Sequence, residues 1–237
     1  SNRPLLSLFG LQVKRDRTRT QLKATALSTG GGARNGLPPK ANMVFILVVL
    51  NAVIYLLDHF SPLYLTGWYL NHRTPEFYQF VTSAFCHANA QHLSSNMFPL
   101  LVFGKLVEEE LGASGLLVCY ILCAILSNIA SIIFLPSYSL GLGASGVVFG
   151  FFVIAIGTRI SLRNFSWRST VEALIFGQYV FEKLKMEVAI TASGGIAGVN
   201  HAAHLGGAAA GLAIVFALRV VLAVLEKSES SSTPRVR

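Results

Sequence analysis

The sequence predicts an all-α, polytopic membrane protein whose six spans form one bundle. Hydrophobic residues make up 53% of the 237 residues and charged residues only 13%, whereas ordinary soluble domains carry about 25% charged residues. Residues 111–158 contain no charged side chain. A helical span needs about 20 mainly apolar residues, and irregular backbone facing lipid would leave its polar groups unpaired. We therefore expect helices in these apolar stretches.

The first 42 residues differ in composition from the rest of the chain. They hold eight of the 19 Lys and Arg residues and one of the 11 acidic residues, which gives them nearly all of the net charge of +8. A basic, acid-poor segment ending in a Gly- and Pro-rich stretch predicts an organellar transit peptide with a disordered linker. A basic cytoplasmic tail is the alternative. Because no folded basic face is predicted, we expect no nucleic-acid partner.

The membrane domain is predicted to extend over residues 43–225. The first span covers about residues 41–57, and the Tyr- and Trp-bearing loop after it, residues 58–78, is predicted to lie at the headgroup level. The second span covers residues 86–104, because the charged run at residues 105–110 should end it.

The remaining spans follow from apolar runs and their flanking charges. The third covers residues 114–135 and ends before Pro136. The fourth covers residues 144–158 and is followed by three arginines. The fifth, around residues 173–181, has a short apolar run and is the least regular. The sixth covers residues 202–224, with Arg219 near enough to its end to reach the interface, and residues 226–237 form a polar, basic tail.

Charge placement predicts which ends of the helices share one side of the membrane. The N-terminal segment, the loop after the fourth span and the C-terminal tail are basic, so the positive-inside rule assigns them to the stroma, matrix or cytoplasm. The second, fourth and sixth spans then begin at the opposite face. His92, Asn96, Ser145 and His204 lie within about three turns of those starts, so we expect all four in the same half of the membrane.

These four residues predict a nucleophile inside the membrane. A serine beside a histidine is the minimal activated nucleophile, and no Asp or Glu in these spans could complete a triad. We expect a Ser145–His204 dyad, with His92, Asn96 and the backbone N–H of Ser145 as oxyanion donors. Two glycine pairs, Gly146 with Gly150 and Gly207 with Gly211, would let the fourth and sixth helices approach closely.

Polar residues and histidines of this kind also occur in membrane helices without a catalytic role. A lone polar residue in a span is more often an interhelical contact than a catalytic group. Four histidines, including the i, i+3 pair His201 and His204, suggest a metal site as an alternative. Because neither a carboxylate nor a thiolate joins them, we expect no metal and no cofactor. The three cysteines lie in apolar runs and are predicted to be small packing residues.

Residues 77–222 resemble the rhomboid family of intramembrane serine proteases. The matching pieces are His87-x4-His92-x3-Asn96, Gly-Ala-Ser-Gly at residues 143–146, and Ala-His-Leu-Gly-Gly-Ala-Ala-Ala-Gly at residues 203–211. The resemblance implies a six-helix fold, the Ser145–His204 dyad, transmembrane proteins as substrates, and a mobile fifth helix that admits them. It also implies a set of supporting residues, namely Gly143, Ala144, Gly146, Phe149, Gly207 and Gly211.

The basic N-terminal segment makes the chain most similar to plastid members of the family. This predicts a multi-pass protein of the chloroplast inner envelope membrane, with the mitochondrial inner membrane as the alternative.

The chain departs from the family pattern at three places. Many relatives have Trp-Arg where this chain has Tyr78-Gln79, and Glu-x-Arg where it has Glu108-Glu109-Glu110. Phe149 stands where relatives often have Tyr, which keeps an aromatic face for His204 but removes its hydroxyl. A second hypothesis is therefore a catalytically silent rhomboid-fold scaffold that binds membrane proteins or works within a larger membrane complex.

Overall fold

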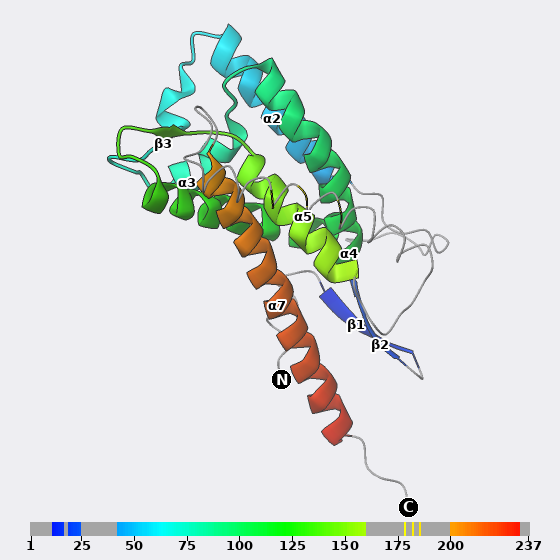
Figure 1. Cartoon of the computed structure of the whole chain (residues 1–237). Coiled ribbons are helices and arrows are strands. Elements are labelled where there is room, and N and C mark those ends of the chain that lie inside the picture. The colour runs from blue at the N-terminus through cyan, green and yellow to red at the C-terminus, as the bar shows by residue number, and fades with distance from the viewer. Residues whose placement is uncertain are drawn as a thin grey trace, which may run out of the picture.

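The chain forms an all-α bundle of membrane-spanning helices (Figure 1). The computed structural model describes residues 11–16, 19–24, 42–159 and 200–232, together with positions 178, 182 and 185. Within these residues, three helices are long and apolar enough to cross a membrane: α2 (Met43–Phe60), α4 (Ala90–Phe134) and the first 24 residues of α7 (His201–Ser232). The helix α5 (Ser145–Arg159) is shorter and also apolar.

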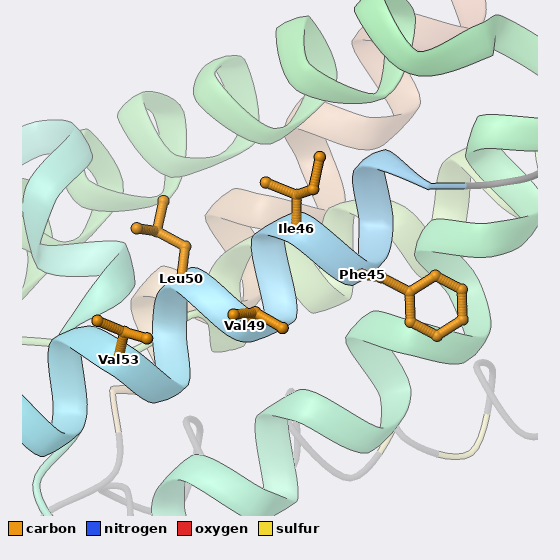
Figure 2. Close-up of a pocket in the computed structure, with 5 residues that line it drawn as sticks. All are labelled: Phe45, Ile46, Val49, Leu50 and Val53. Atoms are coloured by element: carbon orange, nitrogen blue, oxygen red, sulfur yellow. The ribbon is translucent and has the colours of Figure 1, made fainter.

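Helix α2 divides into a packed face and an exposed apolar face. The buried positions Val44, Leu47, Asn51 and Ile54 recur every three or four residues, as expected for one stripe of a helix. The opposite side is 41–59% exposed yet wholly apolar, and it forms a shallow depression (Figure 2). Apolar exposure of this extent suits contact with lipid chains. This depression is lined by Phe45, Ile46, Val49, Leu50 and Val53.

Helix α4 contains the second and third predicted spans. Its 45 residues are interrupted at Gly112, where φ is 74° and ψ is 175°, a conformation that glycine adopts without a steric penalty. Beyond this point Tyr120 donates from its hydroxyl to Ala84 O (3.1 Å), and the Asn128 amide donates to Ser83 Oγ (2.8 Å). Both partners precede α4, so the chain doubles back at Gly112 into two antiparallel arms.

The boundaries of the second span differ from the prediction at both ends. The helix begins at Ala90 instead of residue 86, because Asn89 accepts a hydrogen bond from His92 N (2.8 Å) as its N-cap. Residues 79–85 form two separate short helices, α3 (Gln79–Thr82) and η2 (Ser83–Phe85). The charged run at residues 105–110 does not end the span, and the helix continues through it.

One carboxylate of this charged run, Glu108, has its hydrogen-bond partners inside the protein. Its carboxylate accepts hydrogen bonds from the backbone N–H groups of Asn42 (3.1 Å), Met43 (2.9 Å) and Val44 (3.0 Å) at the start of α2. These N–H groups have no partner within their own helix. The side chain is therefore turned into the protein, where it caps α2 from a position more than 60 residues along the chain.

Helices α5 and α7 lie side by side and run in the same direction. Gly146 faces Gly207 and Gly150 faces Gly211, so the contacts advance along both helices together. Arg219 donates to Gly157 O (3.1 Å) near the end of α5, where a cation also favours the helix dipole. Figure 1 shows α7 extending beyond the other helices, and its continuation to Ser232 means that residues 226–232 of the predicted polar, basic tail are helical.

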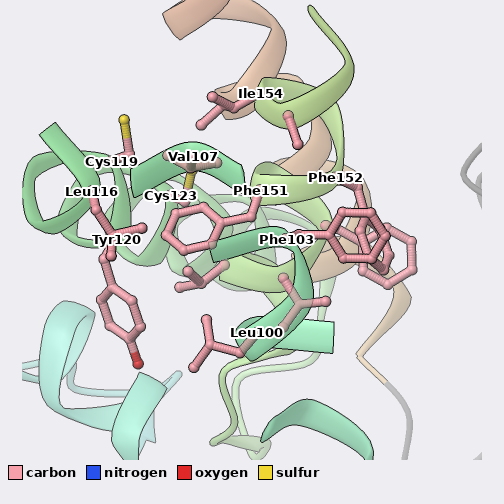
Figure 3. Close-up of a cluster of buried hydrophobic side chains, with 14 of the residues drawn as sticks. Leu100, Phe103, Val107, Leu116, Cys119, Tyr120, Cys123, Phe151, Phe152 and Ile154 are labelled. Atoms are coloured by element: carbon pink, nitrogen blue, oxygen red, sulfur yellow. The ribbon is translucent and has the colours of Figure 1, made fainter. Parts of the chain in front are cut away.

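The core lies between the two arms of α4 and α5 (Figure 3). Lipid is as apolar as these side chains, so close packing, rather than escape from water, holds such helices together. Phe103 and Phe152 meet edge to face with centroids 4.2 Å apart, and Cys119 and Cys123 lie in this cluster as small packing residues. Its labelled members are Leu100, Phe103, Val107, Leu116, Cys119, Tyr120, Cys123, Phe151, Phe152 and Ile154.

The strands are short and lie outside the helical core. In the loop after α2, β3 (Leu70–Asn71) pairs antiparallel with β4 (Leu140–Gly141), which joins this loop to the segment just before α5. Strands β1 (Leu11–Asp16) and β2 (Arg19–Ala24) form an antiparallel pair. They occupy part of the N-terminal segment that was predicted to be disordered, because Leu and Val alternate with polar residues there. Apart from position 178, the fifth predicted span lies outside the described residues, and the count of six spans stays a prediction.

Candidate active site

The site is built around the first turn of α5. Gly143 has φ of 120°, a value that other L-residues rarely adopt, and its N–H donates to Ser83 O (2.9 Å). Ala144 is fully buried and accepts from Val148 N (2.9 Å) as the helix begins. Ser145 is the first residue of α5 and is partly exposed. Its backbone N–H is one of the unpaired donors at the positive end of the helix.

His92 and Asn96 of α4 face the backbone just before Ser145. A Cβ atom on Gly143 would lie 2.7–2.8 Å from the His92 ring and 3.9 Å from Asn96 Nδ2, so only glycine leaves room for the imidazole. Ala88 N donates to His92 Nδ1 (3.3 Å). The neutral ring therefore carries its hydrogen on Nε2, the nitrogen nearer Gly143. The Asn96 amide nitrogen donates to His92 O (2.8 Å) and has a second hydrogen to offer.

The glycine pairs bring α5 and α7 into backbone contact. A methyl group on Gly207 would collide with the carbonyl oxygen of Gly146, and one on Gly211 would lie 2.5 Å from Gly150 O. A Cβ on Gly146 would be 3.1 Å from Ala203 O, next to His204. The close approach predicted from the spacing of these glycines is therefore present at the depth of Ser145.

His204 lies in the first turn of α7 and packs on α5. Its imidazole stacks on the Phe149 ring with centroids 4.6 Å apart and an interplanar angle of 12°. Phe149 follows Ser145 by about one helical turn. The prediction that Phe149 supplies an aromatic face to His204 is confirmed. His204 is 9% exposed, and its backbone N–H donates to Asn200 O (3.2 Å).

The predicted site residues thus gather at one end of the bundle. Ser145 lies between Gly143, which touches His92, and Gly146, which touches the residue before His204. The catalytic roles of these residues stay predictions. The four histidines fall into two pairs, with ring centroids 5.1 Å apart for His87 and His92, and 6.0 Å for His201 and His204. Among the residues that the structure describes, no group of three or more His, Cys, Asp or Glu could hold a metal ion.

Gln79, one of the departures from the family pattern noted above, holds the loop after α2. Its Oε1 accepts from the N–H groups of Asn71 and Glu76 (both 3.1 Å), and its Nε2 donates to Gly67 O (2.9 Å). The side chain is only 6% exposed. Sequence reasoning identified this position as a departure but not its function. The available signal was that an amide both accepts and donates, which an arginine cannot do.

Comparison with known proteins agrees with the geometry. A model of the rhomboid domain matches residues 74–220. Rhomboid-like protein 11, chloroplastic, of Arabidopsis thaliana is 44% identical over 190 residues, which are 76% of this chain and 66% of that protein. YdcA of Bacillus subtilis (strain 168), a proposed rhomboid protease, is 29% identical over 117 residues, or 46% of this chain and 59% of that protein.

A third relative, RHOMBOID-like protein 6, mitochondrial, of Arabidopsis thaliana, is 28% identical over 146 residues, which are 60% of this chain and 44% of that protein. The chain spans about two thirds or less of the length of these relatives. The domain match covers more than half of the 237 residues and includes α4, α5 and most of α7. This chain is an integral membrane protein that belongs to the rhomboid family.

Proposed function

We propose that this protein is an intramembrane serine endopeptidase that cleaves transmembrane segments of other membrane proteins. The observation that supports it most is the backbone contact between the first turns of α5 and α7, which brings the segments bearing Ser145 and His204 together. The His92 ring on the other side of this turn supplies an N–H donor. Ser145 is partly exposed at the start of α5, and the proposed reaction requires water to reach its hydroxyl from the aqueous face.

The reaction follows the chemistry of an activated serine. His204 takes the proton of the Ser145 hydroxyl as the oxygen attacks the scissile carbonyl carbon, and a tetrahedral oxyanion forms. His204 then gives this proton to the leaving amine as the C–N bond breaks. Water, deprotonated by His204, attacks the acyl-enzyme and releases the carboxylic acid and the Ser145 hydroxyl. The Ser145 N–H, His92 and Asn96 would donate hydrogen bonds to this oxyanion. One such donor lowers the activation barrier by about 3 kcal/mol.

The test is labelling by a fluorophosphonate probe in detergent or reconstituted bilayers. Wild type should be labelled, and Ser145→Ala and His204→Ala should not. Ser94→Ala is the matched control, because Ser94 is exposed and its hydroxyl donates within its own helix, to Gln91 O (3.1 Å). Equal labelling of wild type and Ser145→Ala would reject the proposal. Cleavage of a model transmembrane substrate, with the cut located by mass spectrometry, should follow the same order.

The departures from the family pattern do not favour the scaffold hypothesis. Gln79, at an altered position, makes three hydrogen bonds that hold the loop after α2. Glu108 keeps the glutamate of the Glu-x-Arg pattern and caps the first helix with three more. Rescue of a null phenotype by Ser145→Ala would instead support a scaffold.

We also propose a plastid location, in the inner envelope membrane, with residues 1–42 as the targeting segment. The name of the Arabidopsis relative, chloroplastic, supports this assignment. In the proposed orientation the catalytic end faces away from the stroma. Import of a fluorescent fusion into isolated chloroplasts, followed by envelope fractionation, tests the location. Import into mitochondria alone would refute it.

A further inference from the structure

Three polar side chains from distant parts of the sequence form one hydrogen-bonded chain beside the proposed site. The Ser131 hydroxyl, on the second arm of α4, lies 2.6 Å from His72 Nε2 and 2.6 Å from Asn200 Nδ2. His72 Nδ1 lies 2.9 Å from Ser139 O, just before β4. Ser131 is fully buried and His72 is 6% exposed. Side chains 59 and 69 residues apart in sequence therefore meet at one buried hydroxyl.

The partners determine where the hydrogens lie. Ser139 O is a carbonyl and can only accept, so His72 Nδ1 carries the hydrogen. Burial lowers the pKa of His72 below its ordinary value, which favours the neutral ring at pH 7. Nε2 is then an acceptor, and the Ser131 hydroxyl donates to it. Ser131 in turn accepts from the Asn200 amide. Hydrogen bonds are thus donated in one direction, from Asn200 through Ser131 and His72 to Ser139 O. Each of the three side chains has a partner at each end.

Asn200 connects this chain to the helix that carries His204. Its Oδ1 accepts from Ala203 N (2.9 Å) as the N-cap of α7, and its own carbonyl accepts from His204 N (3.2 Å). A cap by itself stabilises a helix without fixing its position. Here the opposite end of the same amide is bonded to Ser131, so the start of α7 is tied to α4 and, through His72, to the loop after α2.

We propose that Ser131 and His72 are positioning residues, which hold Asn200 and thereby keep the His204 imidazole in place against Phe149 and beside the start of α5. This inference rests on the proposed function, in which His204 is the general base. A displacement of about 1 Å in such a group can lower a rate by about 100-fold. Neither residue has to touch substrate for its loss to slow the reaction.

Two substitutions at His72 test separately its hydrogen bond to Ser131 and its hydrogen bond to Ser139. In His72→Gln, the side-chain oxygen reaches about as far as Nε2 and can accept from Ser131. In His72→Asn, the shorter amide can donate to Ser139 O but does not reach Ser131. We expect His72→Asn to behave like Ser131→Ala, and His72→Gln to stay within about threefold of wild type.

The first readout is the rate constant of fluorophosphonate labelling, measured together with the final labelled fraction. Ser131→Ala and His72→Asn should lower the rate constant by about 10- to 100-fold while labelling still goes to completion. A merely structural role would lower the final fraction and leave the rate constant of the folded molecules unchanged. That result, or equal rate constants for His72→Asn and His72→Gln, would overturn the inference.

The second readout does not depend on activity. Amide hydrogen exchange at Ala203 and His204 should be about tenfold faster in Ser131→Ala than in wild type, with later amides of α7 unchanged. Unchanged exchange at these two amides would overturn the inference. If the probe labels neither wild type nor Ser145→Ala, the proposed function fails. Exchange alone then decides whether Ser131 fixes the start of α7.

Discussion

Replacing the Glu108 carboxylate should destabilise the start of α2. The carboxylate accepts three backbone hydrogen bonds of 2.9–3.1 Å, and the residue is 6% exposed. In Glu108→Gln the volume is nearly unchanged, but the charge is lost and an NH2 group faces a backbone N–H. Glu108→Ala removes every acceptor. The two variants therefore separate the charge from the complete set of hydrogen bonds.

The size of the expected destabilisation follows from the number of hydrogen bonds that Glu108 accepts. A hydrogen bond to a charged group contributes about 1.5–3 kcal/mol, so three of them set an upper limit of about 5–9 kcal/mol. The N–H groups of a first turn can regain water, and bonds to one carboxylate are not additive. We expect a loss of about 2 kcal/mol for Glu108→Gln and about 4 kcal/mol for Glu108→Ala.

The assay is the free energy of unfolding in mixed micelles, with helicity followed by circular dichroism. Glu109→Gln is the matched control, because this neighbouring carboxylate is exposed, and it should change stability by less than about 1 kcal/mol. Hydrogen exchange at Met43 and Val44 should accelerate only in the Glu108 variants. If Glu108→Gln and Glu109→Gln were equally stable, Glu108 would not be the cap of α2.

Three further predictions concern the loop, the helix contact and pH. Gln79→Ala should lower the free energy of unfolding by about 2–3 kcal/mol through loss of three hydrogen bonds, and Gln79→Arg should not restore it, because Arg has no acceptor. Gly207→Ala should separate α5 from α7, since its methyl group meets the Gly146 carbonyl, with a loss of about 3 kcal/mol or more and no probe labelling. Burial lowers the pKa of His72 in the folded state, so the unfolded state binds protons more tightly than the folded state. The free energy of unfolding should therefore fall as pH decreases below about 6.5. This fall should be less steep in His72→Gln, which has no imidazole at that position.

Each of these three predictions has a control variant or a result that would contradict it. For the loop, a Gln79→Arg variant as stable as wild type would contradict the assigned hydrogen bonds. Gly67→Ala is the matched control for the helix contact, because no atom of the described residues lies within 4 Å of an added Cβ there, and it should be near neutral. For pH, identical slopes of stability in wild type and His72→Gln between pH 7 and 5 would show that His72 does not contribute.

The helix contact at the site could be predicted from the sequence because its signals are local. Glycines four residues apart mark a face that another helix can approach, and Gly146, Gly150, Gly207 and Gly211 do meet. The position of His204 follows, because it lies one turn before this face. Phe149, one turn after Ser145, could be matched to it for the same reason.

The residues that fix the loops could not be predicted in this way. Glu108 lies in a run of three carboxylates, and composition alone assigns such a run to the end of a helix. Only the fold shows that one carboxylate turns inward and its neighbours stay exposed. His72 and Ser131 likewise have no local pattern, because their contact joins residues 59 positions apart. The kink at Gly112 was predicted only as a break between two spans.

The glycine contact between α5 and α7 has a consequence for motion. Where two backbones touch with no side chain between them, there is nothing to repack, and sliding by even a fraction of a residue would drive Cα atoms into carbonyl oxygens. The two helices therefore behave as a single rigid body. Any opening that lets a substrate helix reach their common end has to come from the elements around this pair.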